Sequence, residues 1–350
     1  MAFTVVGGGL STYIPSTNDL ATGALQVEFT RSVNSFALTR YAQIVPTTKM
    51  TGFYLRQDVA DNVRLTNDRE FAWPLGNDRP TGKQNSFDFI QYVTQRYAFP
   101  FYIPQETTQQ AAWDVVAQHA RSKAQLAMTA RTNRAASVLT DSTVWGNNYA
   151  AFLASAPLSL PPGSSWTDST AGNAYIQKTI QKVMRLVSLS SGGAVAPNQL
   201  MMVISPDVAN VISQAPEVKE YVKNYPQALS FLQGSDTFSR WGIPSTLFGL
   251  GDVIVDDSVK VTSKKGAATQ TSAYVYGNGA YFVSRPGGLV GVEGATSFST
   301  VQIFAYEDMT VEQFNDPMNR RIEGRVIDNS VAAVVAPVGG FAIGNVVSGS

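Results

Sequence analysis

The chain changes its periodicity over residues 86–139, which read SFDFIQYVTQRYAFPFYIPQETTQQAAWDVVAQHARSKAQLAMTARTNRAASVL. In the first part of this stretch, aromatic and β-branched residues alternate with polar ones. A period of two residues is typical of a half-buried strand, so the sequence predicts one strand over 86–103, which Pro100 and Pro104 close.

From Glu106 onward, apolar residues recur at steps of three and four, the pattern of one face of a helix. They are Trp113, Val116, Ala117, Ala120, Ala124, Ala127, Met128, Ala135 and Val138. Thr107 or Thr108 is positioned to cap the first turn. An unbroken helix over about 106–139 would be roughly 50 Å long, and its alanines would let it pack closely across a sheet.

A charged segment precedes the strand and spans residues 51–96. Only 15% of the whole chain is charged, yet this segment interleaves charges of both signs. Gly, Asn, Asp and Pro gather at 74–82 and predict that the segment folds back as a long two-stranded hairpin. An isolated hairpin is marginally stable in water, so its apolar residues cover either the chain's own core or a neighbouring molecule. These residues leave both readings open.

Composition sets the broad class. A chain of 350 residues can bury a substantial core, as two subdomains or one elaborated domain. Lys plus Arg equals Asp plus Glu at 26 each, so no overall basic excess indicates nucleic-acid binding. The absence of cysteine excludes disulfides and thiolate metal sites. Residues 1–15 lack the pattern of a signal peptide, and we expect synthesis and folding in the cytoplasm.

The remainder of the chain predicts a mixed unit of helices and strands. A Pro/Ser/Gly-rich passage at 156–172 suggests a nearby boundary, and Ser205-Pro206-Asp207 is a good helix start. Gly277-Asn278-Gly279 joins two of the strands. The predicted elements are a helix at 174–188, strands at 200–204, 253–255, 273–276 and 281–284, and strands at 300–306 and 320–335 that return beneath the long helix.

Signals for catalysis or metal binding are weak. His119 lies among alanines with no nucleophile or carboxylate at a useful spacing, so we expect a structural or exposed role. Gly7-Gly8-Gly9 lacks the spacing of a dinucleotide loop, and no phosphate-loop motif occurs. Asp256-Asp257 could bind a cation, but a turn after the strand at 253–255 explains the pair more simply. Residues 331–347 are almost uncharged but too short and too rich in Gly and Pro for a membrane span. We expect buried strand residues at 331–335, followed by a Gly-rich terminal segment.

The order of the parts resembles the major capsid proteins of tailed bacteriophages, the Hong Kong 97 type of fold. The resemblance rests on the strand Tyr97-Ala98-Phe99-Pro100-Phe101-Tyr102-Ile103-Pro104 leading into a spine-like helix, and on the α/β unit that begins Pro197-Asn198-Gln199-Leu200. It also rests on the strand and helix start at 200–208, LMMVISPDV. The resemblance covers nearly the whole chain and implies an α+β fold.

The resemblance also implies a division of the chain. Its parts would be an N-terminal arm at 1–50, an extended loop lying over a neighbouring subunit at 51–96, a peripheral domain at 97–194 with the spine helix at about 106–139, an axial domain at 195–299, and return strands of the peripheral domain with a C-terminal tail at 300–350. Residues 218–232 and 260–271 would face the local symmetry axis.

The implied function is structural. The chain would self-assemble into pentamers and hexamers of an icosahedral phage head that encloses double-stranded DNA without sequence-specific binding. It would lie in the virion, after assembly in the host cytoplasm, with a separate scaffolding protein, a portal and possible decoration proteins as partners. No enzymatic activity, cofactor, metal or membrane association is expected.

Contacts between subunits would come from the charged segment. Aromatic residues would supply buried area and arginines would pair with carboxylates of the adjacent subunit. The candidates are Phe53, Tyr54, Arg56, Arg64, Arg69, Phe71, Trp73 and Arg79. Some relatives cross-link a loop lysine to a neighbour's asparagine, but we do not expect this reaction between Lys83 and Asn315, Asn319 or Asn329.

Two other classes of function remain as alternatives. An encapsulin-like compartment would share the fold and contain protein cargo. A soluble binding or hydrolytic protein would remain a small oligomer at every concentration.

Overall fold

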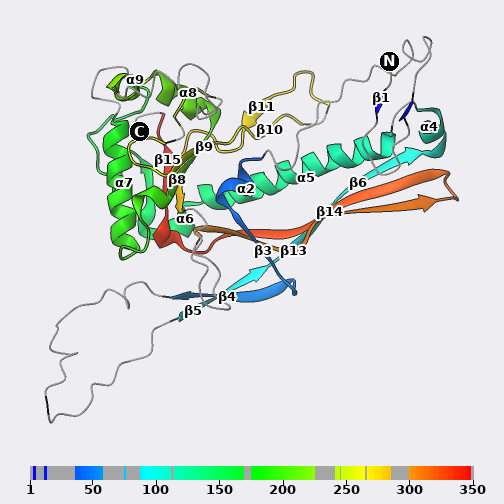
Figure 1. Ribbon diagram of the computed structural model, residues 1–350, viewed down its shortest axis with the longest axis horizontal. Coiled ribbons are helices and arrows are strands. Elements are labelled where there is room, and N and C mark those ends of the chain that lie inside the picture. Colours follow the sequence, from blue (N-terminus) through cyan, green and yellow to red (C-terminus); the bar gives the residue numbers. More distant parts are fainter. Residues whose placement is uncertain are drawn as a thin grey trace.

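The computed structural model describes residues 3–4, 12–13, 36–57, 75, 87–111, 114–168, 175–224, 241–244, 246–264, 266–284 and 299–347. Within these ranges the chain forms two main sheets, each covered by helices, and three short two-stranded ladders (Figure 1). One ladder pairs β1 (Phe3–Thr4) with β2 (Thr12–Tyr13).

A long four-stranded sheet has the order β3-β13-β14-β6. Its strands are β3 (Gln43–Pro46), β13 (Val301–Asp316), β14 (Arg321–Val334) and β6 (Gln95–Pro104). β13 and β14 form an antiparallel hairpin, β6 is antiparallel to β14, and β3 is parallel to β13. The helix α5 (Val115–Thr140) lies along one face of this sheet (Figure 1). The predicted return of the last strands beneath the long helix is therefore confirmed.

A second sheet has the order β7-β15-β12-β8-β9. Its strands are β7 (Tyr149–Phe152), β15 (Phe341–Asn345), β12 (Ala280–Ser284), β8 (Leu200–Ile204) and β9 (Asp252–Val255). The nearby helices are α2 (Leu38–Tyr41), α6 (Ser142–Trp145), α7 (Ile176–Ser190), α8 (Pro206–Gln214) and α9 (Pro216–Asn224). Short 3-10 turns occupy Gly146–Asn148, Pro197–Gln199 and Pro337–Gly339.

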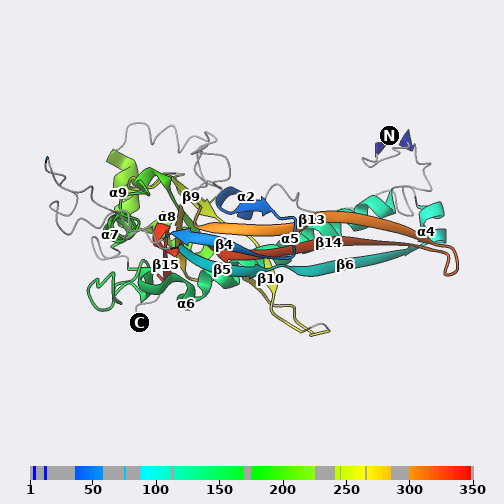
Figure 2. The same ribbon diagram turned by 90° about the horizontal axis from the view of Figure 1, so that it is seen from below.

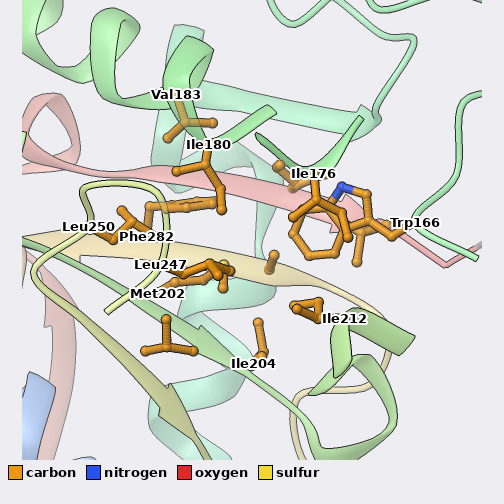
Figure 3. Close-up of a cluster of buried hydrophobic side chains, with 14 of the residues drawn as sticks. Trp166, Ile176, Ile180, Val183, Met202, Ile204, Ile212, Leu247, Leu250 and Phe282 are labelled. Atoms are coloured by element: carbon orange, nitrogen blue, oxygen red, sulfur yellow. The ribbon is translucent and has the colours of Figure 1, made fainter. Parts of the chain in front are cut away.

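Both faces of β8 are buried, and each face contributes to a different core. Met202 and Ile204 point toward Ile180 and the other residues that α7 and α8 place over the sheet (Figure 3). Met201 and Val203 belong to a second core, which also contains residues of α2, α5, β13 and β14. The second core therefore joins the two sheets.

In the described part of this passage, residues 156–168, buried side chains pack into the same core as Met202 and Ile204, beside exposed residues such as Pro161 and Pro162. Leu158 and Trp166 are fully buried there, and the Trp166 N–H of the main chain donates to the carbonyl oxygen of Val346. Residues on both sides of this passage thus share one core with β8.

The predicted strand over 86–103 was wrong in one respect, because it is two strands in different sheets. β5 (Phe87–Val93) pairs with β4 (Thr51–Gln57), whereas β6 pairs with β14. The break falls at Thr94, whose backbone N–H and side-chain hydroxyl both donate to the carbonyl oxygen of Met50, at 2.8 and 3.2 Å. Apolar and polar residues alternate on both sides of Thr94, so the sequence pattern did not indicate that one strand ends there and another begins.

The long helix also differs from the prediction. A short helix, α4 (Gln105–Gln110), is followed by a separate start of α5, where the Asp114 carboxylate accepts from the Ala117 N–H at 3.0 Å. Thr107 and Thr108 lie inside α4 and cap neither helix by their side chains. α5 has 26 residues and is about 39 Å long.

The strands around Gly277-Asn278-Gly279 do not pair with each other. β11 (Ser272–Tyr274) pairs with β10 (Val259–Val261), and β12 lies between β8 and β15. Figures 1 and 2 place the β10–β11 ladder beside α5. The position of residues 218–232 and 260–271 at a local symmetry axis stays a prediction, and residues 225–232 lie outside the described ranges. In the described part of the chain, no helix is both long and apolar enough to span a membrane.

Candidate assembly surface

The base of the charged hairpin, β4 with β5, lies on the face of the long sheet opposite α5 (Figure 1). Tyr54 and Tyr92 both stack on Phe304 of β13, with ring centroids 5.6 and 4.3 Å apart and interplanar angles of 19° and 6°. Stacked aromatic rings add to the stabilisation that area burial gives. The chain's own sheet thus anchors this side of the hairpin.

Gly52 makes this anchoring possible. It lies directly opposite Tyr92 in the ladder, and the Tyr92 ring covers its backbone. A Cβ atom at Gly52 would lie 2.5 Å from the Tyr92 hydroxyl oxygen. An aromatic ring that folds over a cross-strand glycine is a recurrent way to stabilise a ladder.

The other face of the hairpin base is exposed and largely apolar, with Thr51 and Gln91 as polar residues opposite Val93 and Phe53. Its described apolar members are Phe53, Leu55, Phe89 and Val93, which are 64%, 58%, 72% and 52% exposed. Leu55 and Phe89 lie directly opposite each other in the ladder. We call these four residues the hairpin patch. Contiguous exposed apolar surface of this kind marks an interaction site more often than a bare surface.

The predicted contact residues fall into three groups. Phe53 lies in the hairpin patch. Tyr54 stacks on Phe304, and Arg56 pairs with Asp88 of its own hairpin at 3.1 Å. Arg64, Arg69, Phe71, Trp73 and Arg79 lie outside the described residues. Leu55, Phe89 and Val93 were not predicted, although their alternation with Tyr54 and Tyr92 was a signal for two distinct faces.

The distal half of the sheet carries an ordered polar surface on the same side as the hairpin. Glu323 lies between Tyr102 and Phe314 in the register of the three strands, and both aromatic side chains are exposed. Arg325 pairs with Glu312 at 2.5 Å, and Arg321 pairs with Glu323 at 2.5 Å. Charges on this side of the sheet are thus paired within the chain.

Comparison with solved structures identifies the architecture. A phage-related protein from Bordetella bronchiseptica RB50 aligns with a TM-score of 0.60 at 14% identity, over 89% of this chain and 92% of that one. The mature capsid of bacteriophage PhiM1 aligns with a TM-score of 0.55 at 12% identity, over 92% and 89%. The capsid of an empty GTA particle aligns with a TM-score of 0.52 at 14% identity, over 94% of both chains.

The chain has the Hong Kong 97 type of capsid fold. The resemblance in the sequence and the predicted α+β class are confirmed at the level of fold. No protein-family model matches the sequence, and no curated protein matches it. At sequence identities of 12–14%, the similarity to these proteins is detected in the structure and not in the sequence.

In this capsid fold, a buried ionic cluster holds the spine helix α5 on the sheet. Arg131 donates to Asp328 of β14 from Nε at 3.3 Å and from a terminal nitrogen at 2.5 Å, and Arg134 also donates to the Asp328 carboxylate. Ser330 donates to the same carboxylate at 2.9 Å. Burial by itself lowers the pKa of Arg131, but hydrogen bonds and charge from Asp328, with Asp308, reverse this effect and raise the pKa. The guanidinium therefore stays charged in the core.

A second buried polar cluster fixes α2. The hydroxyls of Tyr41 and Tyr276 share a hydrogen bond, and both side chains are fully buried. Burial, with the nearby charge of Asp256, raises the pKa of both tyrosines well above the ordinary value. Arg40 reaches Asp252 of β9 at 2.9 Å. These contacts tie α2 to the second sheet.

The candidate catalytic and metal residues have structural surroundings. His119 Nδ1 lies 2.8 Å from the Val115 carbonyl oxygen, and its ring centroid lies 6.1 Å from that of Phe101. Asp256 accepts from the Ser258 N–H at 2.9 Å in the turn between β9 and β10, which confirms the predicted turn. Among the described residues, no group of three His, Cys, Asp or Glu could hold a metal ion. Residues 7–9 and Lys83 lie outside the described ranges.

Proposed function

We propose that this chain is a major capsid protein that self-assembles into pentamers and hexamers of an icosahedral phage head enclosing double-stranded DNA. The observation that carries the proposal is the hairpin patch, presented by a hairpin whose other face is stacked on Phe304. A fold shared with capsid subunits over about nine tenths of the chain supports it. In a shell, the patch is covered by the next subunit.

The free energies of single contacts favour an assembly held by many weak contacts between subunits. Complete burial of a Phe or Leu side chain stabilises by about 1.5–3 kcal/mol, before the cost of ordering the partners. An exposed ion pair contributes about 0–1 kcal/mol, so paired charges set register more than strength. The candidates Arg64, Arg69, Phe71, Trp73 and Arg79, which lie outside the described residues, are proposed to contribute to the same contact.

The division of the chain follows the same proposal. The arm at 1–50 and the loop at 51–96 reach neighbours, residues 97–194 and 300–350 form the peripheral domain, and residues 195–299 form the axial domain. The subunit acts as a structural protein of the virion without enzymatic activity, assembled in the host cytoplasm with a scaffolding protein, a portal and decoration proteins. DNA is held without sequence readout.

Assembly is the direct test. The chain is expressed with its scaffolding partner, and particles are followed by size-exclusion chromatography and negative-stain microscopy. We expect closed shells or capsomer rings from the natural chain and loss of both in Leu55→Ser/Phe89→Ser. Leu189→Ser is the control, because Leu189 is an apolar residue 69% exposed on α7 and is not part of the hairpin. A persistent monomer of the natural chain would refute the proposal, and shells filled with protein instead of DNA would identify an encapsulin-like compartment.

A further inference from the structure

Charge is distributed unequally between the two sides of the long sheet. On the hairpin side, Arg56, Arg96 and Arg325 each pair with a carboxylate of the chain, at 2.5 to 3.2 Å. On the α5 side, Asp328 and Asp308 engage Arg131, and Asp328 also engages Arg134. Because these carboxylates are already paired, the net charge of the α5 side depends on its other basic residues.

The helix α5 contains no Asp or Glu between residues 115 and 140. Lys123 lies on this helix and is partly exposed, and the described residues give it no ion-pair partner. Its polar neighbours along the helix are amides and hydroxyls, such as Gln118 and Ser122. The carboxylates at the two ends are engaged, because Asp114 caps α5 and Asp141 caps α6.

The β10–β11 ladder adds to the same side. It contacts α5 and projects past it (Figure 2). Residues 258–276 contain no Asp or Glu, whereas Lys260 and Lys264 are exposed and have no ion-pair partner among the described residues. Lysines without nearby carboxylates attract polyanions, and the attraction weakens as salt rises.

From this placement we infer that α5 and the β10–β11 ladder form a basic surface that binds the phosphate backbone of duplex DNA, with Lys123, Lys260 and Lys264 as its cations. The inference rests on the proposed function and adds that this side of the sheet faces the enclosed DNA. Amides and hydroxyls beside lysines are groups that commonly contact phosphates without reading bases. Each subunit binds weakly, and repetition over a shell makes the contact significant.

The test measures binding of the soluble, unassembled chain to a short fluorescent DNA duplex over a series of salt concentrations. Each neutralised phosphate contact contributes about 0.9 to the slope of log K against log salt. For Lys260→Gln/Lys264→Gln we expect a slope shallower by about 1.8 and weaker binding at low salt. Lys123→Gln should reduce the slope by about half as much.

The matched control is Lys219→Gln/Lys223→Gln, which removes the same charge from exposed positions on α9. Equal weakening by this control, or no binding by the natural chain at low salt, would overturn the inference. Binding of polyglutamate with the affinity and salt slope of DNA would overturn the choice of nucleic acid and favour an acidic protein partner. Because the chain is unassembled throughout, a failure to form shells would count against the proposed function alone.

Discussion

Arg131 of α5 and Asp328 of β14 form an ion pair that solvent does not reach, with side chains 3% and 0% exposed. The residues are 197 positions apart in the chain. The pair joins the spine helix to the strand that runs beneath it, and Arg134 approaches the same carboxylate while its guanidinium lies 4.0 Å from the centroid of the Tyr97 ring.

Replacement of Asp328 by Asn should destabilise the subunit strongly. It leaves Arg131 buried with one partner carboxylate fewer, and breaking a buried pair costs about 3–5 kcal/mol. Urea unfolding would measure the change. Arg325→Ala, which breaks an exposed pair with Glu312, is the control and should cost about 0–1 kcal/mol. A similar small effect of both variants would show that the cluster does not hold α5.

Alkaline pH should weaken the fold through the Tyr41–Tyr276 cluster. Both folded-state pKa values are raised above the ordinary 10.0, so the folded chain keeps protons that the unfolded chain releases. Their contribution is fully present below about pH 10 and declines as the pH rises above it.

The double variant Tyr41→Phe/Tyr276→Phe should show a shallower loss of stability between neutral and strongly alkaline pH, measured by urea midpoints. Tyr102→Phe, at an exposed position, is the control and should follow the natural chain. An unchanged profile in the double variant would assign the alkaline loss to other groups.

Replacement of Gly52 by Ala should disturb the hairpin base. The new Cβ would meet the Tyr92 ring, which must then leave its stack on Phe304. Overpacking of this kind costs about 1–3 kcal/mol. Hydrogen exchange at 51–57 would report the loosening.

A double-mutant cycle supplies the control for Gly52. In a Tyr92→Ala background the ring is absent, so Gly52→Ala should cost little there. Equal costs in both backgrounds would mean that the ring does not constrain this position.

Replacement of Ser205 by Ala should destabilise the start of α8. The Ser205 hydroxyl accepts from the Val208 N–H at 3.4 Å and donates to the Gly277 carbonyl oxygen at 2.5 Å. Loss of a helix cap costs about 0.5–2 kcal/mol. Ser213→Ala, at a partly exposed position near the C-terminal end of α8, is the control in thermal unfolding, and an equal effect of the two would contradict a capping role for Ser205.

Local chemistry made some elements predictable. The strand at 200–204 and the helix start at Ser205 were both correct, because a short apolar run and a capping serine followed by proline act within a few residues. The prediction that the segment 51–96 folds back as a two-stranded hairpin is confirmed at its base, where β4 pairs with β5. The turn at Asp256 follows from the same kind of short-range signal.

Several features that depend on contacts between distant parts of the chain could not be predicted from the sequence. The apolar stripe of the spine helix did not indicate that Arg131 and Thr132 lie in its buried face, because their burial depends on Asp328 and its strand. The hairpin patch was only partly predicted. Which face of the hairpin is covered depends on Phe304 of β13, which is more than 200 residues away in the chain and stacks with Tyr54 and Tyr92. The basic surface on α5 was hidden by a net charge of zero, which is an average over both sides of the sheet.

The junction at Thr94 has a mechanical consequence. Both of its hydrogen bonds end on the carbonyl oxygen of Met50, so they close the base of the hairpin where its two strands leave the long sheet. The rings of Tyr54 and Tyr92 hold this base against Phe304 of the sheet. The strands β4 and β5 share no ladder with the long sheet, so a change in the angle of the hairpin would break no strand pairing between them. Under the proposed function, such a change would let identical subunits fit both fivefold and sixfold surroundings in one closed shell.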